Sequence, residues 1–460
     1  MIAIENPKPV ISDRLSRWTL LIFACALINF LLAQVMIVAG FTWPSVTYAD
    51  GTTLVAVHLM TIGWLTLLMF GALFQFVPVI TGRPLYHQWL SMMTLILVEA
   101  GLMCMLAGFM ALTHGYPRLT DCLPVGGTLV LAGSLCAIVN VAIPLLHTQP
   151  LPLPGRFVLA GLAFLLVTVL LGLTFALALS VPVFTPHVLP LLSGGLGYHV
   201  LAGLGGWFTL TAMGVTYKLL PMFMLAPEDR GWWGTTVLQF GIFGLVLSLG
   251  TGLMQLWRPH AEFLRLLLYF GGLLIEVAVT VYLIDIVRLY RTRKRVRIEL
   301  HNRAAFGAFL SLAAVLIIAV ILTVGHRLAA YAPALTLLML FGWLSGLGLT
   351  QLYKIVPFLT WITRYGHQLG HGTVPRVQDL VDEAHTSPWF IIYFFGVALA
   401  TVAAFNGTAY VCRVGAAFSL LATFGLTFEY YRSWRGHYAE CTKPKAPGFP
   451  PFLPKGGHIS

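Results

Sequence analysis

A Gly-Trp pair occurs three times in this 460-residue chain, and each time a proline follows at the same distance. The pairs are Gly63-Trp64, Gly206-Trp207 and Gly342-Trp343, and their prolines are Pro78, Pro221 and Pro357, each 15 residues after its glycine. The second and third copies also share the segment Tyr-Lys-x-x-Pro. Their glycines lie 143 and 136 residues apart, about a third of the chain, and this period predicts a structural unit that is present three times.

Composition indicates where these units reside. Hydrophobic residues make up 58% of the chain and charged residues 9%, with a mean hydropathy of +0.86, which is typical of a membrane protein. A spanning helix needs ~20 mostly apolar residues, and only helices satisfy their own backbone in hydrocarbon. Twelve segments qualify: 17–40, 53–80, 89–113, 125–147, 156–180, 190–222, 235–256, 263–287, 305–326, 330–359, 388–405 and 409–431. The sequence predicts an all-α polytopic membrane protein.

Basic residues predict how the chain is oriented. They gather before the first span and in every second loop after it, most densely in segment 288–303. The positive-inside rule therefore predicts cytoplasmic termini in a multi-pass protein of the inner (cytoplasmic) membrane. This topology explains the net charge of +11 without a nucleic-acid partner, and we expect the bilayer to be the main partner. The N-terminus shows no signal-peptide pattern.

Twelve spans and three copies predict a single membrane domain made of three four-helix units. Their approximate bounds are 17–147, 156–287 and 305–431, followed by a cytoplasmic tail at 432–460. No soluble catalytic module is expected, and whether the protein forms homo- or hetero-oligomers stays open. The six cysteines show no metal-binding spacing, and pairing of Cys122 with Cys412 stays open as well.

Two histidines distinguish the first two units from the third. His58 lies five residues before its glycine and His199 seven before, whereas the third copy has Leu337 and Leu335 at these offsets. At 1.5 Å per residue both histidines lie ~30 Å from the following proline, in the outer half of the membrane. A polar side chain there is expensive and often functional. A histidine bonded to water or a carbonyl is the simpler alternative, but the equivalent positions favour ligands.

These features resemble subunit I of the haem–copper oxidase and nitric-oxide reductase superfamily, and its C-type branch most. The resemblance rests on His58 through Trp64 to Pro78 and on Gly197-Tyr198-His199 through Pro221. It implies twelve helices in three units related by a pseudo-threefold axis. It also implies that His58 is a haem ligand and that His199 lies on the helix that supplies a copper ligand.

The sequence departs from that family at its copper site. The seventh span has no histidine pair, and a copper ion held by one imidazole would bind weakly. We therefore expect neither copper nor oxygen reduction. The remaining histidines predict one b-type haem, with His58 and His199 as metal ligands on its two faces. His326 is the next candidate ligand, and Met60, Met213 and Met339 are further alternatives.

The favoured hypothesis is an integral membrane haem protein that transfers electrons or binds nitric oxide. A quinone or a redox protein is a possible partner, and whether the chain is an oxidoreductase stays open. The alternative is a non-redox transporter, or an assembly factor for respiratory or copper enzymes. Glu99 and Glu276 also lie within predicted spans. Proton conduction or quinone contact is one interpretation of them, and an interhelical hydrogen bond is the other.

Overall fold

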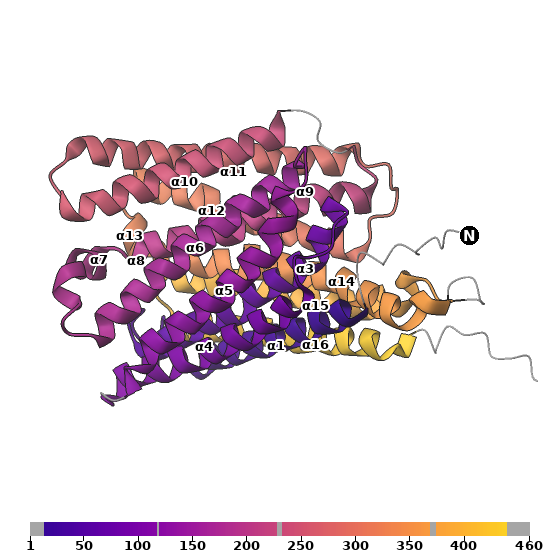
Figure 1. The fold of residues 1–460 in the computed structure, drawn as a ribbon, viewed down its shortest axis with the longest axis horizontal. Coiled ribbons are helices and arrows are strands. Elements are labelled where there is room, and N and C mark those ends of the chain that lie inside the picture. The colour runs from indigo at the N-terminus through magenta and orange to yellow at the C-terminus, as the bar shows by residue number, and fades with distance from the viewer. Residues whose placement is uncertain (1–12, 117–118, 228–231, 369–373, 439–460) are drawn as a thin grey trace, which may run out of the picture.

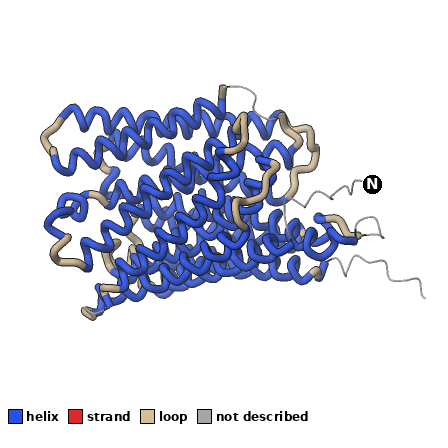
Figure 2. Tube along the Cα trace, in the orientation of Figure 1, coloured by secondary structure: helices blue, strands red, loops and turns tan. Residues whose placement is uncertain are grey.

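A computed structural model describes residues 13–116, 119–227, 232–368 and 374–438. Within these ranges the chain forms helices and no strands (Figure 2). Twelve helical segments are long and apolar enough to cross a bilayer, which makes this a multi-pass membrane protein. They are Arg14–Ala39, Gly51–Thr81, Gln88–His114, Cys122–Leu146, Leu153–Ser180, Leu196–Met224, Trp233–Trp257, Glu262–Thr292, Leu300–Val324, Leu328–Gln368, Glu383–Phe405 and Ala409–Arg435.

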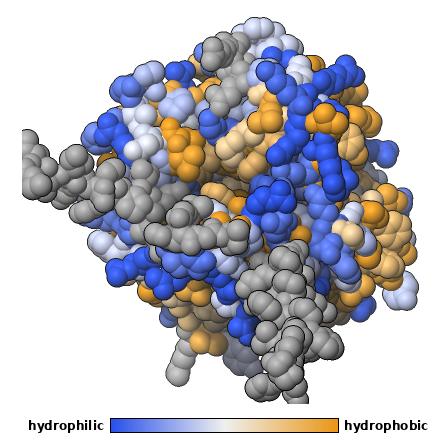
Figure 3. Space-filling view, turned by 90° about the vertical axis from the view of Figure 1, so that its right-hand side faces the viewer, coloured by the Kyte–Doolittle hydropathy of each residue, from blue (hydrophilic) through white to orange (hydrophobic). Residues whose placement is uncertain are grey.

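The spans lie side by side along one axis and are joined by short loops (Figure 1). The first helix, α1 (Asp13–Ala39), begins at the end of the bundle where the last helix, α16 (Ala409–Arg435), ends. We call this the terminal face. Hydrophilic residues gather on it (Figure 3). The distribution of basic residues predicts that this face is cytoplasmic.

Each Gly-Trp pair lies in a π-helical segment that interrupts a spanning helix. The segments are Leu59–Thr66 (η1) between α2 (Gly51–His58) and α3 (Leu67–Thr81), Leu201–Leu210 (η4) between α8 (Leu196–Val200) and α9 (Thr211–Met224), and Leu338–Ser345 (η5) between α13 (Leu328–Leu337) and α14 (Gly346–Tyr365). Such segments are rare and are frequent at functional sites. Trp64, Trp207 and Trp343 are the largest fully buried side chains, so these interrupted helices form the centre of the bundle.

The glycine of each pair allows another helix to approach closely. A Cβ atom on Gly63 would lie 2.7 Å from Asn29 of α1, and one on Gly206 would lie 2.5 Å from Phe164 of α6 (Leu153–Ser180). A Cβ atom on Gly342 would lie 2.6 Å from Ser311 of α12 (Leu300–Val324). The same contact thus recurs three times, with the first, fifth and ninth spans.

The six remaining spans pair into three hairpins, each closed by facing glycines. The hairpins are α4 (Gln88–His114) with α5 (Cys122–Leu146), α10 (Trp233–Trp257) with α11 (Glu262–Thr292), and α15 (Glu383–Phe405) with α16. Their glycine pairs are Gly101 with Gly126, Gly244 with Gly271, and Gly396 with Gly415. In every pair a Cβ atom on one glycine would lie 3.0 Å or less from the carbonyl oxygen of the other. Small residues at crossings of this kind are how membrane helices pack.

Each predicted span corresponds to one helical segment, but several bounds differ by five residues or more. The sixth begins at Leu196 and not 190, the eighth ends at Thr292 and not 287, the ninth begins at Leu300 and not 305, and the tenth and eleventh differ as well. Pro78 and Pro221 stand three residues before their helices end, but α14 continues eight residues past Pro357, to Tyr365. Two short 3₁₀ turns, Gly366–Gln368 and Val377–Leu380, follow, and α15 begins five residues earlier than predicted. Asp382 caps α15 by accepting from the backbone N–H groups of Ala384 and His385, which explains this early start. The tail from 439 onward lies outside the described residues.

Candidate cofactor-binding cavity

His58 and His199 line one cavity between the first two interrupted helices. The cavity holds about 1000 Å³ of atom-free space, including its opening, and its walls are mostly apolar. Helices α4, α5 and α6 and the third interrupted helix complete these walls. His58 is the eighth residue of α2 and lies about 11 Å from the first residue of that helix. It therefore lies in the part of the bundle away from the terminal face.

The imidazole of His58 is fixed from two sides. Its Nδ1 atom lies 2.7 Å from the carbonyl oxygen of Leu54, one turn earlier in α2. Because a carbonyl only accepts, Nδ1 carries the hydrogen and donates it, which leaves Nε2 with a free lone pair. The ring packs against Phe109 of α4, with 4.6 Å between the ring centroids. His58 therefore presents an oriented nitrogen ligand.

His199 lies near the end of α8. Its Nδ1 atom is buried and makes no hydrogen bond of ordinary geometry, although the backbone of Thr168 lies near enough to act on the ring. Phe175 contacts the ring edge-on, at 5.8 Å between centroids. A Cβ atom on Gly172 would lie 3.2 Å from Cε1 of His199, so the glycine makes room for this ring.

The two imidazoles lie close enough to interact electrostatically. Both residues keep intermediate exposure because part of each ring faces the cavity and not protein atoms. The structure thus brings together the two histidines that the sequence singled out. Such a pair, enclosed by aliphatic side chains, offers two nitrogen ligands in a low-dielectric space.

Aromatic rings pack against all three tryptophans, and the ring of Phe70 lies 5.6 Å from that of Trp207. Phe30 stacks on Trp64 with 4.7 Å between ring centroids, and Phe309 and Tyr282 lie at 5.7 and 6.2 Å from Trp343. In the third unit, Thr336 and Leu340 contribute to the cavity wall. Of the three tryptophans, Trp207 alone is among the residues that line the cavity with the two histidines.

The other predicted ligands lie elsewhere. His326 is exposed in the turn between α12 and α13 and is not among the residues that line the cavity. Met60, Met213 and Met339 do not line it either. Cys122 and Cys412 are both free thiols.

The carboxylates of Glu99 and Glu276, which both lie within spanning helices, differ in their surroundings. The side chain of Asn29 donates to Glu99 Oε1 at 2.9 Å, which is the predicted interhelical hydrogen bond. The same amide group lies 3.3 Å from the carbonyl oxygen of Gly63, within the first π-helical segment. Glu276 lies on α11, where its side chain is half-buried.

The sequence analysis missed a hydroxyl residue two positions after each tryptophan. These residues are Thr66, Thr209 and Ser345, and two of them accept hydrogen bonds from tryptophans of other units. The recurring sequence pattern Gly-Trp-x-Ser/Thr could have indicated these hydroxyl residues. A buried indole N–H needs an acceptor, so a hydroxyl at a fixed offset from each tryptophan predicts such a partner.

The donor set fits a haem better than a bare metal ion. Among the described residues, no three His, Cys, Asp or Glu side chains cluster so that they could hold a metal ion. A porphyrin supplies four nitrogens itself, so His58 and His199 would be the residues that hold a haem here, and the group would supply one-electron chemistry. No lysine or arginine belongs to the cavity lining, so the cavity itself offers no cation to the carboxylates of a haem.

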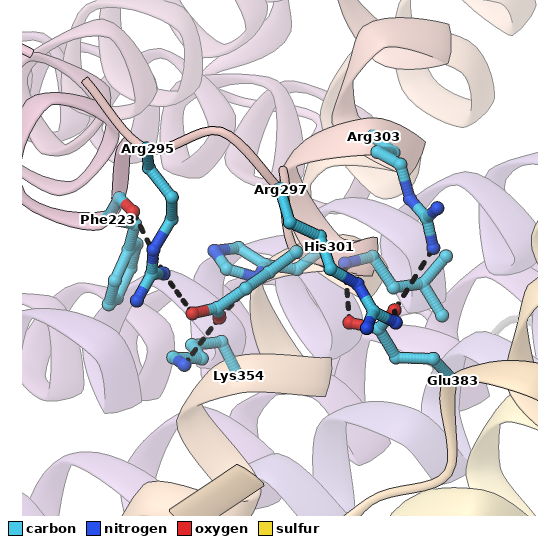
Figure 4. A network of polar contacts seen from close by, with 9 residues as sticks. Phe223, Arg295, Arg297, His301, Arg303, Lys354 and Glu383 are labelled. Atoms are coloured by element: carbon cyan, nitrogen blue, oxygen red, sulfur yellow. Dashed lines mark hydrogen bonds and ion pairs between the residues drawn. The ribbon is translucent and has the colours of Figure 1, made fainter. Parts of the chain in front are cut away.

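A second, polar cavity of about 1080 Å³ lies at the terminal face, around Glu299 and Glu383 (Figure 4). Glu299 contacts Lys354 Nζ at 2.6 Å and also pairs with Arg295. Glu383 lies 3.1 Å from Arg303 and 3.3 Å from Arg297. These ion pairs connect the linker before α12 to α14 and α15.

In comparisons with known proteins, no family model and no curated protein matched this chain.

Proposed function

We propose that this chain is an integral membrane b-type haem protein in which His58 and His199 hold one haem. The observation that carries the proposal is that both imidazoles, 141 residues apart in sequence, face the same apolar cavity. A cavity of this size and polarity is typical of sites for large apolar ligands. When bound between two imidazoles, the group supplies one-electron chemistry.

The residues of the cavity have distinct roles in this proposal. The carbonyl of Leu54 selects the tautomer of His58 and directs its Nε2 to the ligand. Gly172 leaves space for the ring of His199. The aliphatic wall excludes water, which influences the reduction potential of a bound haem. Electrons would be exchanged with a quinone or a redox protein, and no copper takes part.

The proposal includes three four-helix units around a pseudo-threefold axis, as in oxidase subunit I. Three contacts that recur at equivalent places support it: the glycine contact to the first helix of each unit, the π-helical segment, and the glycine-paired hairpin. The resemblance in sequence also supports it, as does the charge pattern that predicts cytoplasmic termini in the inner membrane.

Absorption spectra of the purified protein test the proposal. The reduced protein should show a Soret band and a sharp α band of low-spin haem. His58→Ala and His199→Ala should each abolish that spectrum, while His326→Ala, at an exposed position, should retain it. A colourless preparation from haem-replete cells, or retention of the parent spectrum by both cavity variants, would refute the assignment.

A further inference from the structure

Helix α11 is the spanning helix that the rest of the protein covers least. Only 17% of its most apolar 18-residue window is buried, the smallest share among the twelve spans. The hairpin that it forms with α10 lies at one edge of the bundle (Figure 1). Exposed side chains recur on α11 every seven residues, at Leu266, Leu273, Thr280 and Val287. A seven-residue repeat of this kind keeps one stripe of a helix facing a parallel partner helix.

Glu276 lies in the middle of this stripe. It follows Leu273 by three residues and precedes Thr280 by four, so the three side chains share one side of the helix. It stands 14 residues after Glu262 and 16 before Thr292, the two ends of α11. At ~1.5 Å per residue, the carboxyl group therefore lies near the mid-plane of a bilayer whose hydrocarbon core is ~30 Å thick.

The described part of the protein supplies no partner for this carboxyl group. No hydrogen bond or ion pair there involves the side chain of Glu276, although its backbone carbonyl accepts from the hydroxyl of Thr280 at 2.8 Å. Glu99, in contrast, accepts from Asn29 at 2.9 Å. Ionisable groups in membrane helices almost always face the bundle interior or pair with one another. Glu276, half-buried on the helix at the edge of the bundle, does neither.

A carboxyl group in this position can be satisfied by a copy of itself. An ionised carboxylate is costly in hydrocarbon, whereas the neutral form has one O–H donor and further capacity to accept. In a dimer with a twofold axis along the membrane normal, α11 runs in the same direction in both copies and places Glu276 at the same depth. Each carboxyl group can then donate to the other across the interface.

We propose that α11 is the interface of a homodimer in which the two Glu276 carboxyl groups, one from each copy, are hydrogen-bonded to each other. The stripe of Leu266, Leu273 and Val287 packs against the same stripe of the second copy, and the hydrogen bonds add to this packing. No residue of the stripe lines the histidine cavity, so the dimer does not depend on a haem.

The dissociation constant of the purified full chain in lipid bilayers tests the proposal. Dilution of labelled protein in liposomes, with photobleaching steps counted per particle, should show a dimer for the wild type. Glu276→Leu should weaken the dimer at least ~10-fold, because it keeps the apolar stripe and loses the hydrogen bonds. Glu276→Gln, whose amide both donates and accepts, should dimerise nearly as tightly as the wild type. A monomeric wild type, or two variants of equal affinity, would overturn the proposal.

A matched pair of tryptophan variants tests where the two copies meet. Leu273→Trp places a larger side chain in the stripe beside Glu276 and should weaken the dimer several-fold. Ile391→Trp is the control, because Ile391 is 69% exposed on α15, in a different hairpin. Wild-type affinity in Leu273→Trp would contradict an interface on α11. A dimer of colourless protein would refute the proposed function and leave this inference intact.

Discussion

The indole N–H of Trp64 donates to the hydroxyl of Ser345 at 2.9 Å, although 281 residues separate the two. Trp207 makes the corresponding bond to Thr66 at 3.3 Å. Each acceptor stands two residues after the tryptophan of another unit. The third bond of this cycle is not formed: the indole N–H of Trp343 has no described partner, and the hydroxyl of Thr209 donates to the carbonyl of Leu204 at 2.7 Å. Two of three possible links therefore join the central helices.

Removing the acceptor of Trp64 should destabilise the protein. Ser345→Ala leaves a fully buried N–H without a partner, which costs about 1–3 kcal/mol. Thr209→Ala is the control, because it removes a hydroxyl that bonds only within its own helix. Thermal unfolding in detergent, followed by far-UV circular dichroism, should show the larger loss for Ser345→Ala. Equal losses would mean that the link between units contributes nothing.

Two adjacent glycines of α11 should respond oppositely to alanine. A Cβ atom on Gly271 would lie 2.5 Å from Ser248 Oγ and 3.0 Å from the carbonyl oxygen of Gly244, so Gly271→Ala must separate α10 from α11. We expect a loss of about 1–3 kcal/mol, as for overpacking. Gly272 has nothing within 4 Å, so Gly272→Ala should be neutral or gain up to ~1 kcal/mol in helix propensity. The same unfolding measurement compares them, and a stable Gly271→Ala variant would contradict the packing argument.

Most of the fold was predictable because each span carries its own signal. Length, hydropathy and the Gly-Trp period depend on local sequence, and they predicted twelve helices with most bounds within five residues of those observed. The end of α14 was missed because proline disfavours a helix only locally, and tertiary contacts override it. There Trp361 donates to the carbonyl of Pro375 at 2.6 Å and secures the extra turns.

The candidate site was predictable only in part. Equal depth in a repeat indicated His58 and His199, because depth along a helix follows from counting residues. Rotation about the helix axis is harder to predict, since the π-helical segments shift the register within each unit. Hydrogen bonds between distant spans, such as Asn29 to Glu99, depend on packing that no single span encodes.

Asn29 should stabilise the protein through the hydrogen bonds of its amide group and not through the charge of Glu99. Asn29→Leu removes the donor shared by Glu99 and the carbonyl of Gly63, and we expect a loss of about 1–3 kcal/mol. Glu99→Gln keeps an acceptor for Asn29 and should unfold close to the wild-type temperature. If Glu99→Gln is as harmful as Asn29→Leu, the charge of Glu99 and not the hydrogen bond stabilises this contact.

Glu299 should make the free energy of unfolding depend on pH under acidic conditions. Burial alone would raise the pKa of Glu299, but the hydrogen bond and charge of Lys354, together with His301 and Arg295, hold it below its ordinary value of 4.5. A carboxylate with a lowered pKa stabilises the fold above its unfolded pKa, and this contribution is lost as the pH falls through the folded value. Wild-type stability should therefore decline below about pH 4.5, and Glu299→Gln should decline less.

The same variant measures what the ion-pair network contributes near neutral pH. Glu299→Gln leaves the cations of Lys354 and Arg295 without their carboxylate, so we expect a loss of about 1–3 kcal/mol at pH 7. Glu262→Gln is the control: its side chain is 84% exposed and lies 3.5 Å from Arg265, so its loss should stay below ~0.5 kcal/mol. Unfolding curves at pH 7 and pH 4 compare the three proteins. Because protonated Glu299 resembles glutamine, the gap between wild type and Glu299→Gln should narrow at the lower pH, and a constant gap would show that Glu299 does not titrate with folding.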